Sequence, residues 1–332
     1  MAIITISRQF GSQGEAVAEV LAEATGYTLL NKRTLEGLIT EKHVPDIRLE
    51  WINESSPRRM EELEEKRVQY IEFLKVTISE LAEKKHIFML GRGCQFLFQA
   101  YENAVHFRVI APLEIRAGNI QRRFGVDKAT ALRLINEKDA ERNDYNFYFH
   151  RGDWNDPELY NLTLNTGTSS LAETAGIILY FLRERDVLTP CEYEDIKSEV
   201  VPLLDQKLRD IADGTFQRKV LKGKDGPPVF ANESEEEFAR ILDYYKIEYL
   251  YEPTTFPLRW DSEGNIESAF APDFYFPDFD LYIELTTMKQ QLVTKKNRKL
   301  RELRKLYPHV NIKLFYRRDY HKLLKKFGID KG

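Results

Sequence analysis

IITISRQFGSQG, at Ile3–Gly14, is the stretch that decides the fold of the first half of the chain. It begins as a β-branched apolar run and ends in a turn that contains two glycines. Val17, Val20 and Leu21 then recur at helical spacing, and Gly26 stands where a C-cap glycine is expected. A strand, a glycine turn and a helix in this order form the context in which backbone N–H groups and a helix N-terminus hold phosphate.

The same alternation continues through the first 185 residues. Apolar runs typical of buried strands and periodic stretches typical of helices follow one another: strands at His86–Leu90, Val105–Ala111 and Leu162–Thr166, and helices at Met60–Lys85 and from Ser169-Ser170 to Arg185. Strands that alternate with helices indicate βα units and a parallel sheet covered on both faces. The sequence therefore predicts an α/β fold over residues 1–185.

This half of the chain resembles the cytidylate kinase-like family, a branch of the P-loop nucleoside monophosphate kinases. Five motifs carry the resemblance in the family's order: the opening stretch, GRG at Gly91–Gly93, APLEIR at Ala111–Arg116, KDAER at Lys138–Arg142 and DWNDPELYNLTLNT at Asp153–Thr166. The resemblance implies a nucleotide-binding domain that uses ATP and Mg²⁺ to phosphorylate CMP, dCMP or a related nucleoside monophosphate.

The resemblance also implies roles for individual residues. Arg8, Gly11, Ser12, Gln13 and Gly14 match the loop around the donor phosphates. Arg92 matches an arginine that grips the acceptor monophosphate, a task suited to a planar guanidinium. The lid region, which closes over the transferring group, is matched by Arg116, Arg122, Arg123, Asp139 and Arg142. Without the resemblance, Asp139 and Arg142 would be assigned to the solvated face of a charged helix.

Four positions depart from the expected pattern. A full phosphate loop places lysine and a hydroxyl residue after its second glycine, whereas Glu15 and Ala16 follow Gly14. Gln13 stands where the family commonly has glycine, and Gly93 stands where related kinases have aspartate. Two interpretations therefore stay open: a working kinase, and a catalytically degenerate domain that senses a nucleotide or binds nucleic acid.

A change of pattern marks the middle of the chain. Thr189-Pro190 ends the helix before it, Glu192–Ile211 is predicted as a connecting helix, and KVLKGKDGPP at Lys219–Pro228 is typical of a linker. We therefore predict three parts: residues 1–185, a connection at 186–229, and a second, smaller α/β domain with a mixed sheet at 230–332.

AFAPDFYFPDFDLYIELTT, at Ala269–Thr287, is predicted to form a hairpin at the centre of this second domain. Alternation places Glu284 in an apolar strand, on the face opposite the aliphatic residues. A buried carboxylate needs compensation, and Asp273 on the preceding strand is close enough to share a divalent metal with it. The alternative is a plain hairpin with two satisfied acids.

Residues 230–327 resemble the PD-(D/E)xK, or restriction-endonuclease-like, nucleases, which implies cleavage of DNA or RNA with Mg²⁺ or Mn²⁺. Asp273, Glu284 and Glu235 match the metal ligands. Glu235 is chosen because Phe238, Ala239 and Leu242 follow it on the same helical stripe, and Glu237 is the alternative. The family's lysine falls at Thr286, so Lys289 and Lys296 are candidate replacements.

A basic helix follows the hairpin. KQQLVTKKNRKLRELRK, at Lys289–Lys305, has eight basic residues and one acid. A cationic face of this kind attracts a phosphate backbone without reading its sequence, and a merely solvated face is the alternative. The predicted nucleic-acid contacts are Lys295, Lys296, Arg298 and Lys299.

Composition adds few limits. Two cysteines give no disulfide framework, no apolar run is long enough for a membrane span, and the start MAIITISRQF lacks the features of a signal peptide. We therefore expect a cytoplasmic protein that binds no membrane. The net charge of −4 selects no partner and no oligomeric state. A third hypothesis is that only the kinase is active and the second domain places it on a partner.

Overall fold

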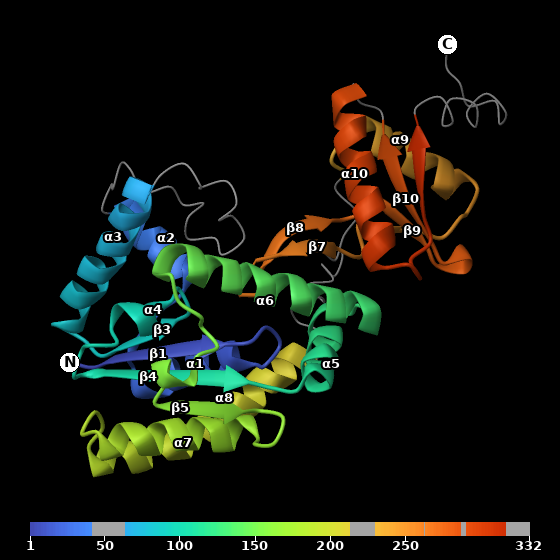
Figure 1. The fold of residues 1–332 in the computed structure, drawn as a ribbon. Coiled ribbons are helices and arrows are strands. Elements are labelled where there is room, and N and C mark those ends of the chain that lie inside the picture. Colours follow the sequence, from blue (N-terminus) through green and yellow to red (C-terminus); the bar gives the residue numbers. More distant parts are fainter. Residues whose placement is uncertain (42–63, 213–229, 262, 287–289, 317–332) are drawn as a thin grey trace. The chain divides into compact units, whose positions relative to one another are not determined.

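A computed structural model describes residues 1–41, 64–212, 230–261, 263–286 and 290–316. The chain divides into two compact units (Figure 1). The first comprises residues 1–122, 128–212 and 261–265, and the second contains the other described residues.

The first unit is built on a parallel sheet. Its strands are β1 (Ile3–Arg8), β2 (Thr28–Leu30), β3 (Ile87–Leu90), β4 (Ala104–Ile110) and β5 (Leu162–Asn165), in the order β2-β3-β1-β4-β5. All four pairings are parallel. The predicted α/β fold is therefore confirmed, and β1 lies at the centre of the sheet.

Alternation along the strands gives the sheet two apolar faces. Ile4 and Ile6 pack into one core, whereas Ile3 belongs to the other. The first core also contains residues of α1 (Gly14–Thr25), α7 (Leu171–Glu184) and α8 (Pro190–Ala212). The second contains residues of α2 (Lys32–Glu41), α3 (Glu64–Ala82), α4 (Cys94–Leu97) and α6 (Lys128–His150). Helices thus cover both faces (Figure 1).

Helix α8 differs from the expected connecting helix. Its buried residues Ile196, Val200 and Leu204 are part of the core that contains β1 and α7. The first unit therefore extends to residue 212 rather than ending at residue 185. Apolar residues at helical spacing predict a helix, but they do not identify the surface that the helix covers.

The second unit contains a four-stranded mixed sheet. Its strands are β6 (Leu250–Tyr251), β9 (Phe274–Phe276), β10 (Leu281–Thr286) and β11 (Ile312–Tyr316), in the order β11-β10-β9-β6. β10 pairs parallel with β11 and antiparallel with β9, and the turn Pro277–Phe279 joins β9 to β10. The predicted hairpin is therefore confirmed.

Two helices and a second hairpin complete this part of the fold. Helix α9 (Glu233–Tyr244) contributes Phe238, Ile241 and Leu242 to a core with Phe274 and Ile283. Helix α10 (Gln290–Leu306) follows β10. Strands β7 (Phe256–Trp260) and β8 (Ile266–Phe270) pair antiparallel.

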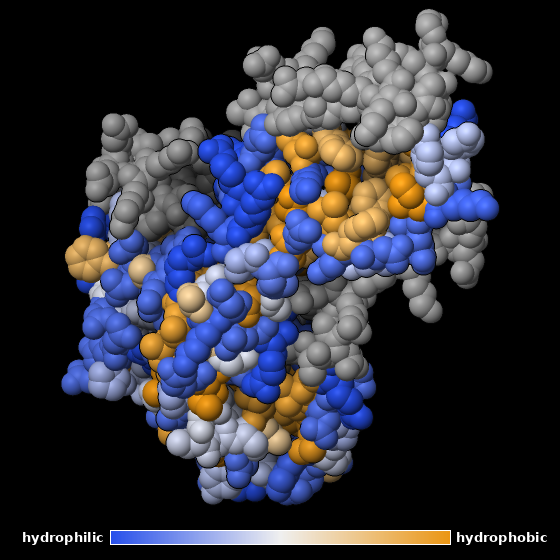
Figure 2. Space-filling model, turned by 90° about the vertical axis from the view of Figure 1, so that its right-hand side faces the viewer, coloured by the Kyte–Doolittle hydropathy of each residue, from blue (hydrophilic) through white to orange (hydrophobic). Residues whose placement is uncertain are grey.

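Exposed apolar residues occur in both units. Among the described residues, the large hydrophobic side chains with the greatest exposure are Tyr244, Phe279 and Phe147. Figure 2 shows orange hydrophobic patches among blue hydrophilic residues on one face of the molecule. Within the described ranges, every helix is too short or too polar to cross a bilayer.

Candidate functional site

The turn after β1 has an unusual backbone. Gly11 has φ of 83° and Gln13 has φ of 63°, so two residues of the turn are left-handed. Gln13 immediately precedes α1. Because β1 is the central strand of a parallel sheet, this turn lies at the carboxyl edge of the sheet, where α/β proteins bind ligands. We refer to Phe10–Ala16 as the phosphate loop.

The carbonyl groups of the phosphate loop are held by side chains of later elements. Asn119 Nδ2 of α5 (Leu113–Phe124) donates to the Gly11 carbonyl at 2.9 Å, and Thr166 Oγ1 donates to the Ser12 carbonyl at 2.8 Å. The backbone N–H groups of the loop, unlike its carbonyl groups, mostly have no hydrogen-bond partner among the described residues. Among the described residues, the N–H groups of Gly11, Gln13, Gly14 and Ala16 donate to no acceptor. These amides are available to an anion.

Glycine is required at both ends of the turn. A Cβ atom at Gly14 would lie 2.7 Å from Arg8 Cβ and 3.0 Å from Val109 Cβ. A Cβ at Gly11, which also has the left-handed φ, would lie 3.0 Å from the Arg116 carbonyl oxygen. The loop therefore packs directly against β1, β4 and α5.

A buried cluster of charges lies beside the loop. Glu15 Oε1 accepts from Arg8 Nε at 2.9 Å and from Arg142 Nη2 at 3.2 Å, and Arg142 Nη1 donates to the Arg8 carbonyl at 2.7 Å. Both arginines are 1% exposed. Two guanidinium groups and one carboxylate together carry one net positive charge. Glu15, which stands where a phosphate loop has lysine, thus forms ion pairs with two arginines.

The predicted lid residues also contact the loop. Arg116 Nη1 lies 2.5 Å from Asp139 Oδ2, and Asp139 Oδ1 accepts from the Phe10 N–H at 2.9 Å. Arg122 Nη2 donates to Asn119 Oδ1 at 2.7 Å. Arg116, Arg122 and Asp139 are therefore gathered around the loop in a single hydrogen-bonded network. The Arg123 guanidinium, in the second unit, lies over the Phe124 ring at 5.3 Å.

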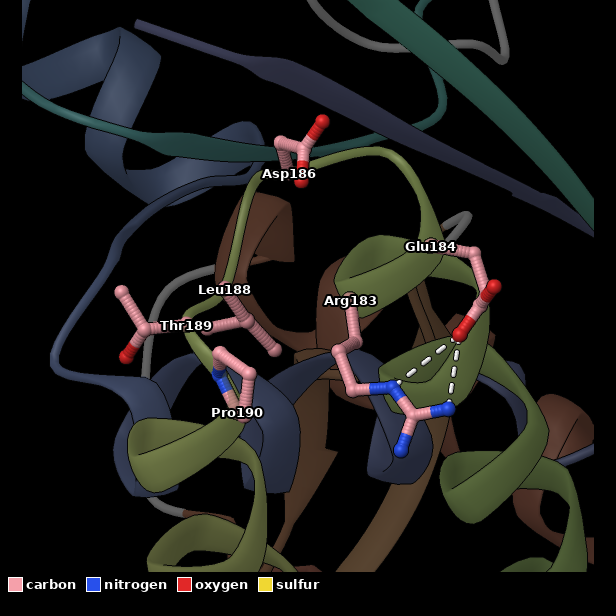
Figure 3. Close-up of a pocket in the computed structure, with 6 residues that line it drawn as sticks. All are labelled: Arg183, Glu184, Asp186, Leu188, Thr189 and Pro190. Carbon is pink, nitrogen blue, oxygen red and sulfur yellow. Dashed lines mark hydrogen bonds and ion pairs between the residues drawn. The ribbon is translucent and has the colours of Figure 1, made fainter.

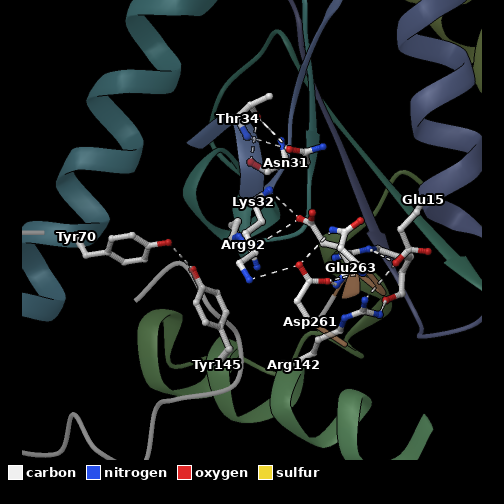
Figure 4. A network of polar contacts seen from close by, with 12 residues as sticks. Glu15, Asn31, Lys32, Thr34, Tyr70, Arg92, Arg142, Tyr145, Asp261 and Glu263 are labelled. Carbon is white, nitrogen blue, oxygen red and sulfur yellow. Dashed lines mark hydrogen bonds and ion pairs between the residues drawn. The ribbon is translucent and has the colours of Figure 1, made fainter. Parts of the chain in front are cut away.

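Arg92 lies at the end of β3 and is 1% exposed. Its Nη2 is 3.2 Å from Glu263 Oε1, which also accepts from the Lys32 N–H at 2.7 Å (Figure 4). Lys32 Nζ is 3.4 Å from Asp261 Oδ2. Lys32, Asp261 and Glu263 were missed by the sequence analysis. Lys32 follows β2 and Arg92 follows β3, and these strands are neighbours in the sheet. The strand order therefore accounts for the position of Lys32 near Arg92.

His150 explains the glycine that follows Arg92. A Cβ atom at Gly93 would lie 2.1 Å from two ring atoms of His150, so the aspartate of related kinases does not fit here. His150 Nε2 lies 3.0 Å from the Arg92 carbonyl oxygen. Burial lowers the pKa of His150 to about 4, against the opposing effect of that hydrogen bond.

The hairpin acids of the second unit are both buried. Glu284 is 2% exposed, and Asp273 Oδ2 accepts from the Leu285 N–H at 2.6 Å. Lys296 Nζ of α10 lies 2.5 Å from Glu284 Oε1 and 2.9 Å from the Leu285 carbonyl oxygen. In the part of the chain that the structure describes, Glu284 Oε2 and Thr286 Oγ1 have no hydrogen-bond partner. Asp273, Glu284 and Lys296 thus form a compact cluster.

The pKa values of the two acids reflect this burial. Burial first, and repulsion by Glu284 second, raise the pKa of Asp273 to about 7. Burial also raises the pKa of Glu284, while the Lys296 ammonium opposes the change. A divalent cation between the two carboxylates would remove both the burial cost and the repulsion.

Glu235 has a different environment from the hairpin acids. Its oxygens accept from Tyr251 Oη at 2.7 Å, from the Ala231 N–H at 2.9 Å and from Asn232 Nδ2 at 2.5 Å. These bonds hold the start of α9. No group of three histidine, cysteine, aspartate or glutamate side chains in the described residues is arranged to hold a metal. The three-acid ligand set with Glu235 is therefore not assembled. The alternative, Glu237, is exposed.

The basic residues predicted to act in catalysis or to contact nucleic acid differ in their surroundings. Lys289 and the side chain of Lys295 lie outside the described residues, and Arg298 is exposed. Lys299 Nζ donates to the Ala269 carbonyl at 2.9 Å, so this lysine contacts β8. A hollow of about 370 Å³ on α10 is lined by Asn297, Leu300, Arg301 and Arg304.

A second hollow, of about 450 Å³, lies at the connection between α7 and α8 in the first unit. Figure 3 shows its lining, with Arg183 paired to Glu184 at 2.6 Å and Thr189 and Pro190 on the other side. None of the predicted site residues lines this hollow.

Comparison with known proteins gives a match for the first unit. Residues 3–168, half of the 332-residue chain, match the model of the cytidylate kinase-like family. No curated protein matches this chain.

Several solved structures are similar. An uncharacterized protein from Eubacterium ventriosum is 21% identical, with a TM-score of 0.44 over 55% of this chain and 98% of its own. Shikimate kinase from Acinetobacter baumannii is 15% identical, with a TM-score of 0.32 over 57% of this chain and 96% of its own. A protein described as a putative kinase, from Chloroflexus aurantiacus, is 16% identical, with a TM-score of 0.32 over 55% of this chain and 97% of its own.

Proposed function

Because the chain belongs to the cytidylate kinase-like family over residues 3–168, we propose that its first unit binds ATP and transfers the γ-phosphoryl group to a nucleoside monophosphate. CMP and dCMP are the proposed acceptors. The donor phosphates lie against the phosphate loop, and the acceptor phosphate lies against Arg92.

One observation carries this proposal: among the described residues, four N–H groups of the phosphate loop donate to no acceptor, and they lie beside the buried guanidinium groups of Arg8 and Arg142. Phosphoryl transfer is mostly positioning and charge neutralisation. The amides supply the positioning. Arg8 and Arg142 supply the positive charge that lysine supplies in other phosphate loops.

The acceptor end of the site follows from the strand order. β2 and β3 are neighbours in a parallel sheet, and β3 pairs with β1. The residues after these strands, Lys32, Arg92 and the phosphate loop, therefore lie along one edge of the sheet. Two cations on the same edge of the sheet as the loop suit an anionic acceptor.

Mg²⁺ accompanies ATP in such reactions, but the loop residues do not fit a protein-bound ion. Ala16 has no hydroxyl group, and the carboxylates of Glu15 and Asp139 form ion pairs with arginines. In the proposed reaction these three residues, Ala16, Glu15 and Asp139, therefore provide no ligand to the metal. Its own groups bind the phosphates and neutralise their charge.

A coupled assay tests this function. The purified protein is given ATP and Mg²⁺ with CMP, dCMP, UMP or AMP, beside the variants Arg92→Ala and Arg133→Ala. Arg133 is an exposed arginine of α6 and serves as the matched control. We expect transfer that Arg92→Ala reduces at least about 100-fold, because it removes a charged contact to the acceptor. ATP binding without transfer would indicate a nucleotide sensor, and an absence of both would refute the proposal.

A second candidate function, metal-dependent cleavage of DNA or RNA by the second unit, is favoured by the hairpin cluster. Asp273 and Glu284 are two buried carboxylates in mutual repulsion, and Glu284 Oε2 has no partner among the described residues. A hard divalent cation such as Mg²⁺ or Mn²⁺ takes carboxylate and water ligands. It would lower the pKa of a bound water, while Lys296 orients Glu284.

Cleavage of labelled single- and double-stranded DNA and RNA tests this second function. The assay contains Mg²⁺ or Mn²⁺, with and without ATP and CMP, and compares Glu284→Gln with Glu248→Gln, an exposed acid of the same unit. We expect cutting that only Glu284→Gln abolishes. A change on adding nucleotide would make the first unit its regulator, and binding without cutting would leave a nucleic-acid-binding module.

A further inference from the structure

The loop between β7 and β8 belongs to the first unit, whereas its flanking strands belong to the second. Asp261 shapes this loop: its Oδ1 accepts from the Glu263 N–H at 2.9 Å and from the Asn265 N–H at 2.8 Å. Gly264 completes the turn with φ of 80°. We call residues 261–265 the acidic loop.

The acidic loop contacts the residues assigned to the acceptor phosphate. Glu263, only 5% exposed, accepts from both Arg92 Nη2 and the Lys32 N–H through one oxygen. Asp261, equally buried, pairs with Lys32 Nζ. Figure 4 shows both acids pointing toward Lys32 and Arg92. Arg92 and both acids are buried and Lys32 is partly buried, so these contacts are shielded from bulk solvent.

The charges of the acidic loop oppose the binding of an anionic ligand at Arg92. Asp261 forms an ion pair with Lys32, and Glu263 forms one with Arg92. A phosphate dianion that approaches Arg92 would meet the Glu263 carboxylate on the same guanidinium, and like charges in a buried site repel strongly. The acceptor phosphate and the acidic loop therefore compete for one binding partner.

We propose that the acidic loop is an internal competitor of the acceptor nucleotide, with the Glu263 carboxylate in the place of the acceptor phosphate. The inference rests on the proposed function, because that function assigns Arg92 to the acceptor. The chain then exists mainly with its acceptor site closed. Acceptor binding requires the loop to withdraw, which lowers the apparent affinity by the fraction of open molecules.

Calorimetric titration of the full chain tests this proposal. The protein is mixed with a non-hydrolysable ATP analogue and titrated with CMP, UMP, AMP or GMP. Glu263→Gln keeps an oxygen for the Lys32 N–H but removes the charge, and Glu102→Gln, at an exposed position of the same unit, is the matched control. We expect Glu263→Gln to bind at least one monophosphate about tenfold more tightly than wild type, and Glu102→Gln to bind like wild type.

Asp261→Asn provides a second variant in case Glu263→Gln lowers the amount of folded protein. It removes the charge beside Lys32 Nζ but keeps the acceptor for the turn, so we expect a smaller gain in affinity.

Three results would overturn the inference. Equal or weaker monophosphate binding by Glu263→Gln would mean that Glu263 positions Arg92 rather than competing with the ligand. An equal gain in Glu102→Gln would mean a general charge effect. If the ATP analogue binds in every variant, these results leave the proposed function intact. If neither the analogue nor any monophosphate binds, the proposed function and the inference both fail.

Discussion

Asp273 shares a buried neighbourhood with Glu284, and this single residue makes the stability of the second unit depend on pH. Its pKa is raised from 3.8 to about 7 by burial and by Glu284. Between these two values the folded state keeps a proton that the unfolded state has lost. The free energy of unfolding therefore falls as pH rises from about 4 to about 7, by up to about 1.4 kcal/mol for each pH unit.

Asp273→Asn should remove the contribution of Asp273 to this dependence, because an amide stays neutral and its oxygen still accepts from the Leu285 N–H. We expect the variant to gain stability over wild type as pH rises from about 5 to about 7, by up to about 2–3 kcal/mol. Urea unfolding across this range measures the effect. Asp278→Asn, at an exposed turn position, should give a constant difference. A constant difference for Asp273→Asn as well would contradict the prediction.

Gly14 gives a second prediction for a single residue. Gly14→Ala places a Cβ atom 2.7 Å from Arg8 Cβ, which is too close to the backbone of β1 to move easily. We expect a loss of about 1–3 kcal/mol in the free energy of unfolding, together with weaker binding of an ATP analogue.

Gly176→Ala is the control for Gly14→Ala. This glycine lies inside α7, and a Cβ there would meet no heavy atom within 4 Å. Alanine should therefore stabilise the protein by about 0.5–1 kcal/mol. Similar effects of the two substitutions in urea unfolding would show that the close approach at Gly14 is not a constraint.

Individual contacts were only partly predictable from the sequence. The glycine turn after β1 indicated a phosphate loop, because left-handed residues and a helix start are local features. Glu263 could not be found in this way. Its partner Arg92 is 171 residues away in the chain, and no periodic pattern connects an acidic turn to a distant arginine. Glu235 was correctly placed among buried residues, but its hydrogen bonds to the helix start could not be foreseen from spacing.

At the scale of elements, α7 has a complete capping box. Ser170 Oγ accepts from the Glu173 N–H at 3.1 Å, and Glu173 Oε2 accepts from the Ser170 N–H at 2.7 Å. Ser170→Ala removes one of these bonds and should cost about 1 kcal/mol in the free energy of unfolding. Thermal or urea unfolding measures it.

Ser169→Ala is the matched control, since Ser169 donates its backbone N–H to the Asn165 carbonyl and this bond survives the substitution. This change should stay within about 0.5 kcal/mol of wild type. A loss as large as that of Ser170→Ala would refute the role of the cap.

The elements themselves were largely predictable. The strands at β1, β3, β4 and β5 and the β9–β10 hairpin occur where their apolar runs predicted them. These elements were predictable because a run of apolar residues is typical of a buried strand. The β7–β8 hairpin was not predicted, because Phe256–Trp260 contains a proline and only one residue of Ile266–Phe270 is buried, so neither segment has a clear two-residue period.

At the scale of the whole molecule, the described residues form separate apolar cores. Ile178 of α7 lies in a core of the first unit and Ile283 of β10 in the core of the second. We therefore expect calorimetry to record more than one unfolding transition. Ile178→Ala and Ile283→Ala should each cost about 2–5 kcal/mol and lower different transitions. A shift of the same single transition by both variants would show that the units unfold together.

The unit boundaries were harder to predict than the units. Composition placed the change near residue 186, yet α8 packs into the first core and the acidic loop returns to the first unit from within the last third of the chain. The linker predicted at Lys219–Pro228 from its charged, glycine and proline residues lies outside the described residues. The return of a short loop leaves no such compositional mark.

The central position of β1 also determines when the sheet can form during synthesis. Ile3 pairs with Ile87 on one side and with Ala104 on the other. At about 5–20 residues per second, a ribosome needs roughly 5–20 seconds between making β1 and completing β4. Until β3 is made, this β-branched apolar strand has neither neighbour, and until β4 is made it has only one, so we expect the segment to be prone to association with other chains during synthesis.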